Sequence, residues 1–371
     1  MTPKQLMLAA IEHRTVERLP AATYNFHPLR SFSQETAYQP MLDALSNAEG
    51  VGILCKCSAR RQQGERDERT TVERQDLGDK SVTTTRIETP KGPLQQIFQT
   101  PLGQPGYRME PFIKDDADVA RLLSLPSEPA QTDLSPAREF HDELGELGLA
   151  YVSYSDPFYS VAHWFDFEDF VMRCVVDLSV IQELVEREFE RIKSELRTTL
   201  AQSRGCEFLF YTGGPEVATP PMMAPKYFEL LVTPYQKSLV AMIKAAGQHA
   251  SIHCHGRVKE VFDQILEIGP DALEPLEPPP QGDIGLTEAL SRAEGRLCLM
   301  GYIQDQDFYL SAPGEMTGKV EDIAEIVNGR TGYIMNPTAT PFMHPPPEQF
   351  VRNYVEFLEA AGRGGQDVSS I

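Results

Sequence analysis

The stretch QHASIHCHGRVKEVFDQILEIGPDALEPLE, residues 248–277, decides the fold. It opens with a short apolar segment that carries His253 and His255. An amphipathic segment follows at 257–269, and a second short apolar segment lies at 272–277. A strand, a helix and a strand in this order are typical of a parallel βαβ unit. The stretch therefore predicts a parallel sheet covered by helices.

The same alternation extends along the chain in both directions. Short apolar segments predict about eight strands: 19–24, 51–58, 147–155, 206–213, 248–255, 272–277, 296–303 and 332–336. Helical segments between them place apolar residues at steps of three and four. No glycine-rich dinucleotide fingerprint follows the first strand, and no GxxxxGK[ST] motif occurs, which disfavours a doubly wound nucleotide-binding fold. We therefore predict an α/β fold, a closed (β/α)8 TIM barrel.

A segment of different texture interrupts this pattern after the second strand. Residues 69–100 are rich in Thr, Val and Ile, with turn signals at 77–79 and 90–92. This composition predicts a β-hairpin or small meander. Although 371 residues exceed the usual domain size, α/β barrels with insertions reach this length. We expect one barrel domain over 1–371 with a β-rich excursion at about 69–100.

The composition excludes several classes of function. A formal net charge of −20 disfavours nucleic acid and anionic membrane surfaces as partners. No apolar run approaches the ~20 residues of a membrane span, and the first residues lack a secretory signal. Six cysteines are too few for a disulfide scaffold, so we expect reduced thiols. These features predict a cytoplasmic protein that acts on a small molecule.

Polar side chains follow most of the predicted strands, where a (β/α)8 barrel carries its chemistry. The candidate catalytic residues are Asp156, Glu216 and His344. The candidate substrate-binding residues are Tyr24, Arg60 and Gln304. An arginine such as Arg60 would clamp a carboxylate or phosphate. Each side chain also has a structural interpretation, as a cap, a loop group or a turn residue.

The two histidines of SIHCHG are the candidate metal ligands. Side chains alternate along a strand, so His253 and His255 share one face and Cys254 points to the other, into the core. With Glu277 they would give three protein ligands and an open position, which suits Zn²⁺ or another first-row divalent ion. Hydrogen-bonded strand histidines remain the alternative. Glu274 has the strand parity opposite to Glu277, so we do not expect both carboxylates at the barrel mouth.

The ordered set of segments resembles the uroporphyrinogen decarboxylase superfamily, specifically its methyltransferase-like branch. The segments that carry the resemblance span nearly the whole chain: MTPKQLMLAAIEHRTVERLP, ETPKGPLQQIF, EPFIKDDADVARLLSL, MMAPKYFELLVTPYQKSLVAMIKAAG, HCHGRVKEVFDQILEIGPDALEPLEPP, RLCLMGYI and PPPEQFVRNYVEFLEAAG. The arginine-rich RQAGR loop of the haem-pathway decarboxylase is absent from the corresponding region, so coproporphyrinogen formation is not expected. The resemblance implies a (β/α)8 barrel.

The resemblance also implies a zinc site. Corrinoid:thiol methyltransferases of this branch bind zinc through a His-x-Cys pair and a distal cysteine, and a similar site in cobalamin-independent methionine synthase adds a glutamate. His253 matches the histidine, His255 stands where the cysteine would be, and Glu277 matches the glutamate. The distal cysteine would fall near Ala339, and His344 is a candidate substitute ligand. A site without thiolates is harder and less selective for zinc.

Three functions follow from these observations. The first is metal-assisted methyl transfer from a small methylated substrate to a corrinoid protein or a thiol, with the corrinoid carried by a separate protein. The second is a metal-free decarboxylation of a tetrapyrrole or smaller acid. The third is a non-catalytic barrel that binds a ligand or a corrinoid protein. The sequence leaves a homodimer open.

Overall fold

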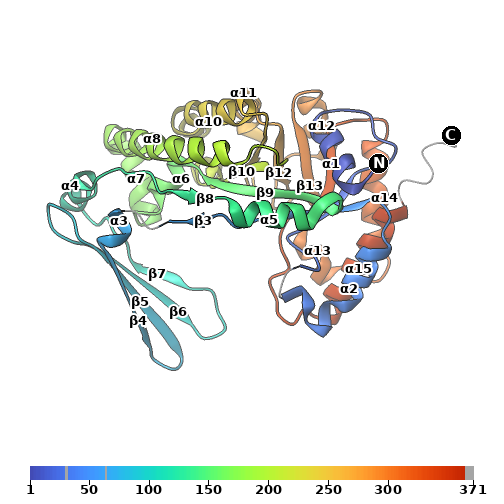
Figure 1. Ribbon diagram of the computed structural model, residues 1–371, viewed down its shortest axis with the longest axis horizontal. Coiled ribbons are helices and arrows are strands. Elements are labelled where there is room, and N and C mark those ends of the chain that lie inside the picture. Colours follow the sequence, from blue (N-terminus) through green and yellow to red (C-terminus); the bar gives the residue numbers. More distant parts are fainter. Residues whose placement is uncertain (30–31, 63–64, 364–371) are drawn as a thin grey trace. The chain divides into compact units, whose positions relative to one another are not determined.

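Eight parallel strands close into a barrel, in the computed structural model of residues 1–29, 32–62 and 65–363 (Figure 1). The order around the barrel is β1-β14-β13-β12-β11-β10-β9-β2. The strands are β1 (Ala21–Tyr24), β2 (Val51–Lys56), β9 (Gly148–Ser155), β10 (Leu209–Gly213), β11 (His249–His253), β12 (Ala272–Leu276), β13 (Cys298–Ile303) and β14 (Tyr333–Pro337). The predicted TIM barrel is confirmed. Because all strands run the same way, their carboxyl ends meet at one mouth.

The chain divides into two compact units, and most of the barrel belongs to the first. This unit comprises 1–59, 134–154 and the chain from Ser203 onward. Its longer helices are α1 (Pro3–Ile11), α2 (Gln39–Asn47), α5 (Ser135–Leu144), α9 (Pro225–Leu231), α10 (Thr233–Ala245), α11 (Phe262–Ile268), α12 (Leu286–Ala293), α13 (Asp305–Leu310), α14 (Glu315–Val327) and α15 (Glu348–Arg363). The helices alternate with the strands, as the sequence pattern predicts.

The second unit comprises 60–133 and 155–202. Its antiparallel sheet has the order β4 (Thr70–Asp76), β5 (Lys80–Ile87), β6 (Leu94–Pro101) and β7 (Tyr107–Glu110). The predicted β-rich excursion is confirmed, but the sheet extends one strand further than 69–100. The remaining elements are β3 (Arg60–Arg61) paired with β8 (Thr132–Asp133), and the helices α3 (Glu65–Glu68), α4 (Asp116–Ser124), α6 (Pro157–Ala162), α7 (Phe167–Val176) and α8 (Leu178–Gln202).

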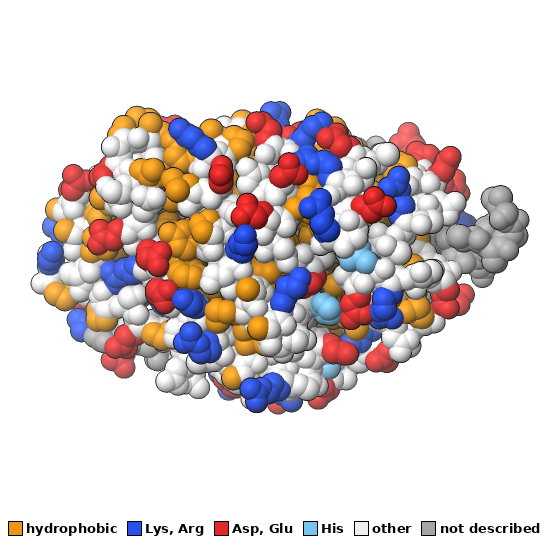
Figure 2. All heavy atoms as spheres, turned by 90° about the horizontal axis from the view of Figure 1, so that it is seen from above, with side chains coloured by type: hydrophobic (Ala, Val, Ile, Leu, Met, Phe, Trp, Pro, Cys, Tyr) orange, Lys and Arg blue, Asp and Glu red, His pale blue; other side chains and the backbone are white. Residues whose placement is uncertain are grey.

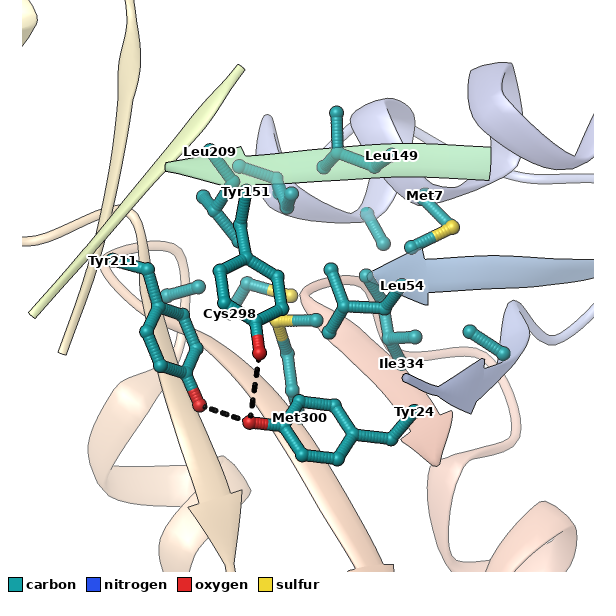
Figure 3. Close-up of a cluster of buried hydrophobic side chains, with 14 residues drawn as sticks. Met7, Tyr24, Leu54, Leu149, Tyr151, Leu209, Tyr211, Cys298, Met300 and Ile334 are labelled. Carbon is teal, nitrogen blue, oxygen red and sulfur yellow. Dashed lines mark hydrogen bonds between the residues drawn. The ribbon is translucent and has the colours of Figure 1, made fainter. Parts of the chain in front are cut away.

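Alternate residues of the barrel strands point inward and fill the interior. The apolar cluster contains Ala22, Leu54, Leu149, Leu209, Ala272, Cys298, Met300 and Ile334, with Met7, Ala10 and Ile11 of α1. Burying one large side chain of this kind stabilises the fold by about 1.5–3 kcal/mol. Three tyrosines belong to the same cluster and carry its hydroxyl groups (Figure 3). The interior is therefore a packed core whose polar atoms come from these tyrosines.

Charged side chains lie on the surface (Figure 2), and the cysteines lie inside. Figure 2 shows one face on which lysine and arginine side chains are interspersed with acidic ones. All six cysteines are buried, and none forms a disulfide in this structure. Among the described residues, no helix is both long and apolar enough to cross a bilayer.

Candidate active site

A chain of hydrogen bonds joins three tyrosines inside the barrel (Figure 3). Tyr151 on β9 donates to the hydroxyl of Tyr24 on β1 at 3.3 Å, and the hydroxyls of Tyr24 and Tyr211 on β10 lie 2.7 Å apart. The rings of Tyr151 and Tyr211 stack with centroids 4.3 Å apart. Asn25 donates its side-chain amide to Tyr151 at 2.9 Å. The predicted substrate-binding residue Tyr24 therefore lies within a buried polar network.

The network ends on a carboxylate. The hydroxyl of Tyr211 donates to Oε2 of Glu274 on β12. Burial, together with the nearby charge of Glu274, raises the pKa of Tyr211 well above its ordinary value. Burial likewise raises the pKa of Tyr24. Because both hydroxyls keep their protons, Tyr24 donates to Tyr211, and Tyr211 donates to Glu274.

Glu274 also holds His253. The Nδ1 atom of His253 lies 2.7 Å from Oε2 of Glu274, and the hydroxyl of Tyr211 contacts the same nitrogen. The parallel register of β11 and β12 places these two residues directly beside one another. Glu274 is completely buried, and its Oε1 atom has no hydrogen-bond partner in the described part of the chain. A buried acceptor without a partner is suited to a ligand or a water molecule.

His255 forms a second pair, with Glu277. Its Nδ1 atom lies 3.3 Å from Oε1 of Glu277, and the amide of Gly256 donates to Oε2 at 2.6 Å. Burial opposes the charge on His255, but the hydrogen bond and negative charge of Glu277 prevail and raise the pKa of His255. Burial also opposes the charge on Glu277, yet hydrogen bonds from His255, Gly256 and Gln304 lower its pKa. The pair therefore favours imidazolium and carboxylate.

The expectation that Glu274 and Glu277 would not both face the barrel mouth is wrong. The register between β12 and β13 shifts between Leu273 and Leu276, so strand parity is not maintained along this segment. A bulge of this kind redirects the side chains that follow it. Both carboxylates consequently reach a histidine of β11 or of the segment after it.

The two imidazoles lie against one another. Their ring centroids are 4.5 Å apart at an interplanar angle of 88°. Each Nδ1 atom faces a carboxylate, while neither Nε2 atom has a hydrogen-bond partner in the residues that the structure describes. A carboxylate behind the ring is the usual second contact of a metal-binding histidine. Cys254, between them, is completely buried in the core, as predicted.

A group of three ligand atoms within 4.8 Å of one another occurs elsewhere in the described residues, at His141, Asp142 and Cys206. There the ammonium of Lys4 lies 3.4 Å from Nε2 of His141, and burial raises the pKa of Cys206, so the group is poorly suited to a cation.

The predicted ligand Glu277 contacts His255 through Nδ1 of that imidazole, not through Nε2. Its role as a ligand stays a prediction.

Two further predicted residues belong to the surroundings of the histidines. Glu216 lies in the short helix η4 (Pro215–Ala218), where its Oε2 atom accepts from the amide of Gly214 at 3.0 Å. Its charge contributes to the raised pKa of His255. Gln304 follows β13, is buried, and donates to Gln306 at 2.6 Å, and it contributes to the lowered pKa of Glu277. The structure thus brings Tyr24, Glu216, His253, His255, Glu277 and Gln304 into one connected group.

The other three predicted residues have structural contacts of their own. His344 is exposed, and its Nδ1 atom lies 2.7 Å from the hydroxyl of the buried Tyr38. Asp156 is completely buried and caps α6 by accepting from the amide of Tyr159 at 2.8 Å. The side chain of Arg60 is 72% exposed and lies 3.6 Å from Asp133. Asp156 and Arg60 lie in the second unit. The catalytic and substrate-binding roles of these three residues stay predictions.

Sequence reasoning missed two members of the group, Tyr151 and Tyr211, and set a third, Glu274, aside on strand parity. The tyrosines could have been found from the sequence, because Tyr24, Tyr151 and Tyr211 each occupy an inward position of a barrel strand. Asn336 is buried on β14, and its Oδ1 atom has no hydrogen-bond partner in the described part of the chain. Asp305, the first residue of α13, is also buried, and burial raises its pKa to about 6.

Comparisons with known proteins agree with the barrel. The family model "Uroporphyrinogen decarboxylase (URO-D)" matches residues 166–360, more than half of the chain. No curated protein sequence matches significantly. Among solved structures, a methyltransferase from Methanosarcina mazei is similar at a TM-score of 0.59 and 12% identity, over 97% of this chain and 98% of that one. A mannanase from Bacillus subtilis reaches a TM-score of 0.43 at 10% identity, over 96% and 88% of the two chains. At 12% identity the Methanosarcina structure shows the fold alone. The family model covers more than half of the chain, so the chain belongs to the uroporphyrinogen decarboxylase family.

Proposed function

We propose that the chain is a methyltransferase-like enzyme of its family, which transfers a methyl group from a small methylated substrate to a corrinoid protein or a thiol. The observation that carries the proposal is the pair of imidazoles at the barrel mouth. Each keeps its Nε2 atom for a ligand while Glu274 or Glu277 holds its Nδ1 atom. The corrinoid would be carried by a separate protein.

The donor set fits a divalent metal ion of borderline hardness. Imidazole nitrogens with nearby carboxylates suit Zn²⁺ and its first-row neighbours. Binding of an ion would displace the Nε2 proton that the raised pKa of His255 favours. The residues that would hold the ion are His253 and His255, with Glu216 or a reoriented Glu277 as a third ligand. When bound, such an ion supplies Lewis acidity toward an oxygen, nitrogen or sulfur atom of a substrate.

The protein groups around the imidazoles have separate tasks. Glu274 accepts from Nδ1 of His253, which fixes the tautomer that leaves Nε2 unprotonated. Tyr211, held by Tyr24, fixes Glu274 in turn. The unpartnered oxygens of Glu274 and Asn336 are acceptors for donor groups of a substrate. Tyr24, Tyr211, His253 and Glu274 stand on strands, which holds this part of the arrangement rigid.

Metal content tests the first step of this proposal. The protein is purified without a histidine tag and analysed for metals beside the variants His253→Ala, His255→Ala and His249→Ala. His249 is a matched control, because it lies on the same strand but pairs with Glu12 and Asp271. We expect about one ion per chain in the wild type and the control, and loss in the other two variants. Folded wild-type protein that takes up no added zinc would contradict the proposal.

Methyl transfer is tested with a free cofactor in place of the carrier protein. Cob(I)alamin is mixed with methylated oxygen, nitrogen and sulfur compounds, and the absorbance change to methylcob(III)alamin is followed. We expect turnover with one class of compound in the wild type and none in His255→Ala. If the metal-loaded enzyme turns over none of them, with either cobalamin or a thiol as acceptor, the methyl-transfer assignment fails while the metal site stands.

A second candidate is metal-free decarboxylation, which the raised pKa of His255 favours. Loss of carbon dioxide leaves a carbanion, and an imidazolium held by Glu277 is a suitable proton donor to it. The test is release of carbon dioxide from uroporphyrinogen and from smaller acids in the presence of a chelator. Release that persists with chelator and disappears in His255→Gln would establish this function instead.

A further inference from the structure

A cavity of about 510 Å³ lies wholly within the second unit. Its walls come from α3, the sheet strands β6 and β7, the segment around α6, and α8. This volume is within the range of small-molecule sites. Three arginines, Arg66, Arg108 and Arg191, line the cavity, together with a single acid, Glu188. In a chain of net charge −20, such a concentration of guanidinium groups requires an explanation.

Arg191 does not contribute a free charge to the cavity. Its Nε and Nη2 atoms bind Oε2 of Glu188 at 2.9 and 2.7 Å, and its Nη1 atom binds Glu195 at 2.6 Å. The one acid of the cavity wall is therefore already engaged. The remaining positive charge of the wall belongs to Arg66 and Arg108.

Arg66 lies over the ring of Trp164 without an acidic partner. Its guanidinium carbon is 4.1 Å from the ring centroid, and no side-chain hydrogen bond or ion pair holds it among the described residues. Burial lowers its pKa to about 10, and the attraction of Glu188 offsets this only in part. A guanidinium that is desolvated, stacked and unpaired gains more from an anion than an exposed one would.

Arg108 has a buried hydrogen-bond donor without an acceptor in the described chain. Its Nη1 atom donates to the carbonyl of Phe165, while its Nε atom is buried and has no partner in the described chain. A buried N–H without an acceptor costs about 1–3 kcal/mol, which an acceptor on a ligand would recover. Phe98 and the ring pair Phe112–Trp164, with centroids 5.0 Å apart, supply flat apolar walls beside it.

We infer that this cavity binds a small ligand that carries a carboxylate or phosphate on an aromatic body. The guanidinium groups of Arg66 and Arg108 would bind the anion, because their planar N–H arrays match carboxylate and phosphate oxygens. The aromatic body would lie against Phe98 and Phe112. The site is independent of the proposed chemistry at the barrel mouth, since all of its lining residues belong to the second unit.

Trp164 allows a direct test, because it is the only tryptophan in the chain and it lines the cavity. The full chain is titrated with benzoate, phenyl phosphate, inorganic phosphate and the neutral benzyl alcohol while the fluorescence of Trp164 is recorded. We expect a saturable change with benzoate, phenyl phosphate or both, which also distinguishes the two anions. We expect much weaker binding of inorganic phosphate and of benzyl alcohol.

Two variants and a control complete the test. Arg66→Met keeps an apolar stem on Trp164 and removes the charge, and Arg108→Gln removes the second guanidinium without depending on the first. Each is expected to weaken binding about tenfold or more. Arg86→Gln is the control, since Arg86 lies on the same sheet, is 49% exposed and pairs with Glu88. The inference is overturned if folded wild type shows no saturable binding at millimolar anion, or if the two variants bind as tightly as the control.

Discussion

Oε2 of Glu274 lies 2.7 Å from Nδ1 of His253 and also accepts from the hydroxyl of Tyr211. One buried carboxylate thus joins the tyrosine network of the barrel interior to the imidazole at the mouth. The contact fixes both the orientation and the tautomer of His253. Glu274 therefore positions the imidazole of His253.

Replacing Glu274 by Gln keeps the shape of the side chain and removes its charge. We expect metal affinity at His253 to fall about 10–100-fold, the usual effect of losing a carboxylate behind a metal-binding histidine. The measurement is competition with a chromogenic chelator. Glu267→Gln is the control, because Glu267 is 56% exposed and pairs with Lys237. Equal affinity in Glu274→Gln and in the control would show that Glu274 does not support a metal site.

The pair of His255 and Glu277 predicts a pH window of stability. The pKa of His255 is raised above 6.5, so its contribution is complete below that pH and is lost as pH rises through the folded-state pKa. The pKa of Glu277 is lowered below 4.5, so its contribution is complete above that pH and is lost only at more acidic pH. The pair therefore stabilises the fold most between pH 4.5 and 6.5.

Glu277→Gln tests this window. The side chain of His255 is 40% exposed, so solvent screening limits the loss of unfolding free energy to below about 1 kcal/mol. Urea denaturation should show this loss between pH 4.5 and 6.5 and a smaller one above the raised pKa of His255. In the NMR titration of the variant, the pKa of His255 should fall. An unchanged titration would mean that Glu277 does not act on His255 in solution.

The barrel could be predicted from sequence because each βαβ unit is encoded locally. A short apolar run, a polar end and an amphipathic helix recur, and the rules of parallel sheets then determine the topology. The boundaries of individual helices and strands were harder to predict. The segment 224–247 forms two helices, α9 and α10, separated at Val232, because Pro234 lies two residues later, within the first turn of α10. The strand β7 was not predicted, because its four residues are too few to show a clear alternation of apolar and polar side chains.

The site was only partly predictable, for a physical reason. His253 ends a strand, and His255, Glu277 and Gln304 follow strands, so all four are recognisable by position. Glu274 was excluded by alternation, which holds only where the register is regular, and the shift between Leu273 and Leu276 is a property of the assembled sheet. The hydrogen bonds from Tyr24 to Tyr211 likewise join strands that are far apart in sequence.

Tyr211→Phe should reveal how much that network stabilises the barrel. The variant leaves the hydroxyl of Tyr24 and Oε2 of Glu274 without one partner each inside a closed core. We expect the unfolding free energy to fall by about 1–3 kcal/mol, measured by urea denaturation. Tyr107→Phe serves as the control, since Tyr107 is 48% exposed. A loss no larger than that of the control would mean that the interior hydroxyls contribute no net stability.

The buried carboxyl of Asp305 is expected to destabilise the fold at neutral pH, whereas the groups above stabilise it. It is 5% exposed, its Oδ1 atom has no partner among the described residues, and burial raises its pKa from 3.8 to about 6. The folded chain keeps this proton where the unfolded chain has lost it, so stability falls as pH rises from about 4 to about 6. Above that range the ionised carboxylate costs up to about 3 kcal/mol.

Asp305→Asn should therefore stabilise the protein at pH 8 and leave its stability nearly unchanged near pH 4. Urea denaturation at both pH values measures the difference. Asp307→Asn is the matched control on the same helix, because Asp307 pairs with Lys319 at 3.1 Å and should gain nothing. A variant that is more stable at pH 8 but loses ligand or metal binding would identify Asp305 as a residue kept for function at a cost in stability. A loss of stability at pH 8 would instead show that the folded protein supplies Asp305 with a cationic partner.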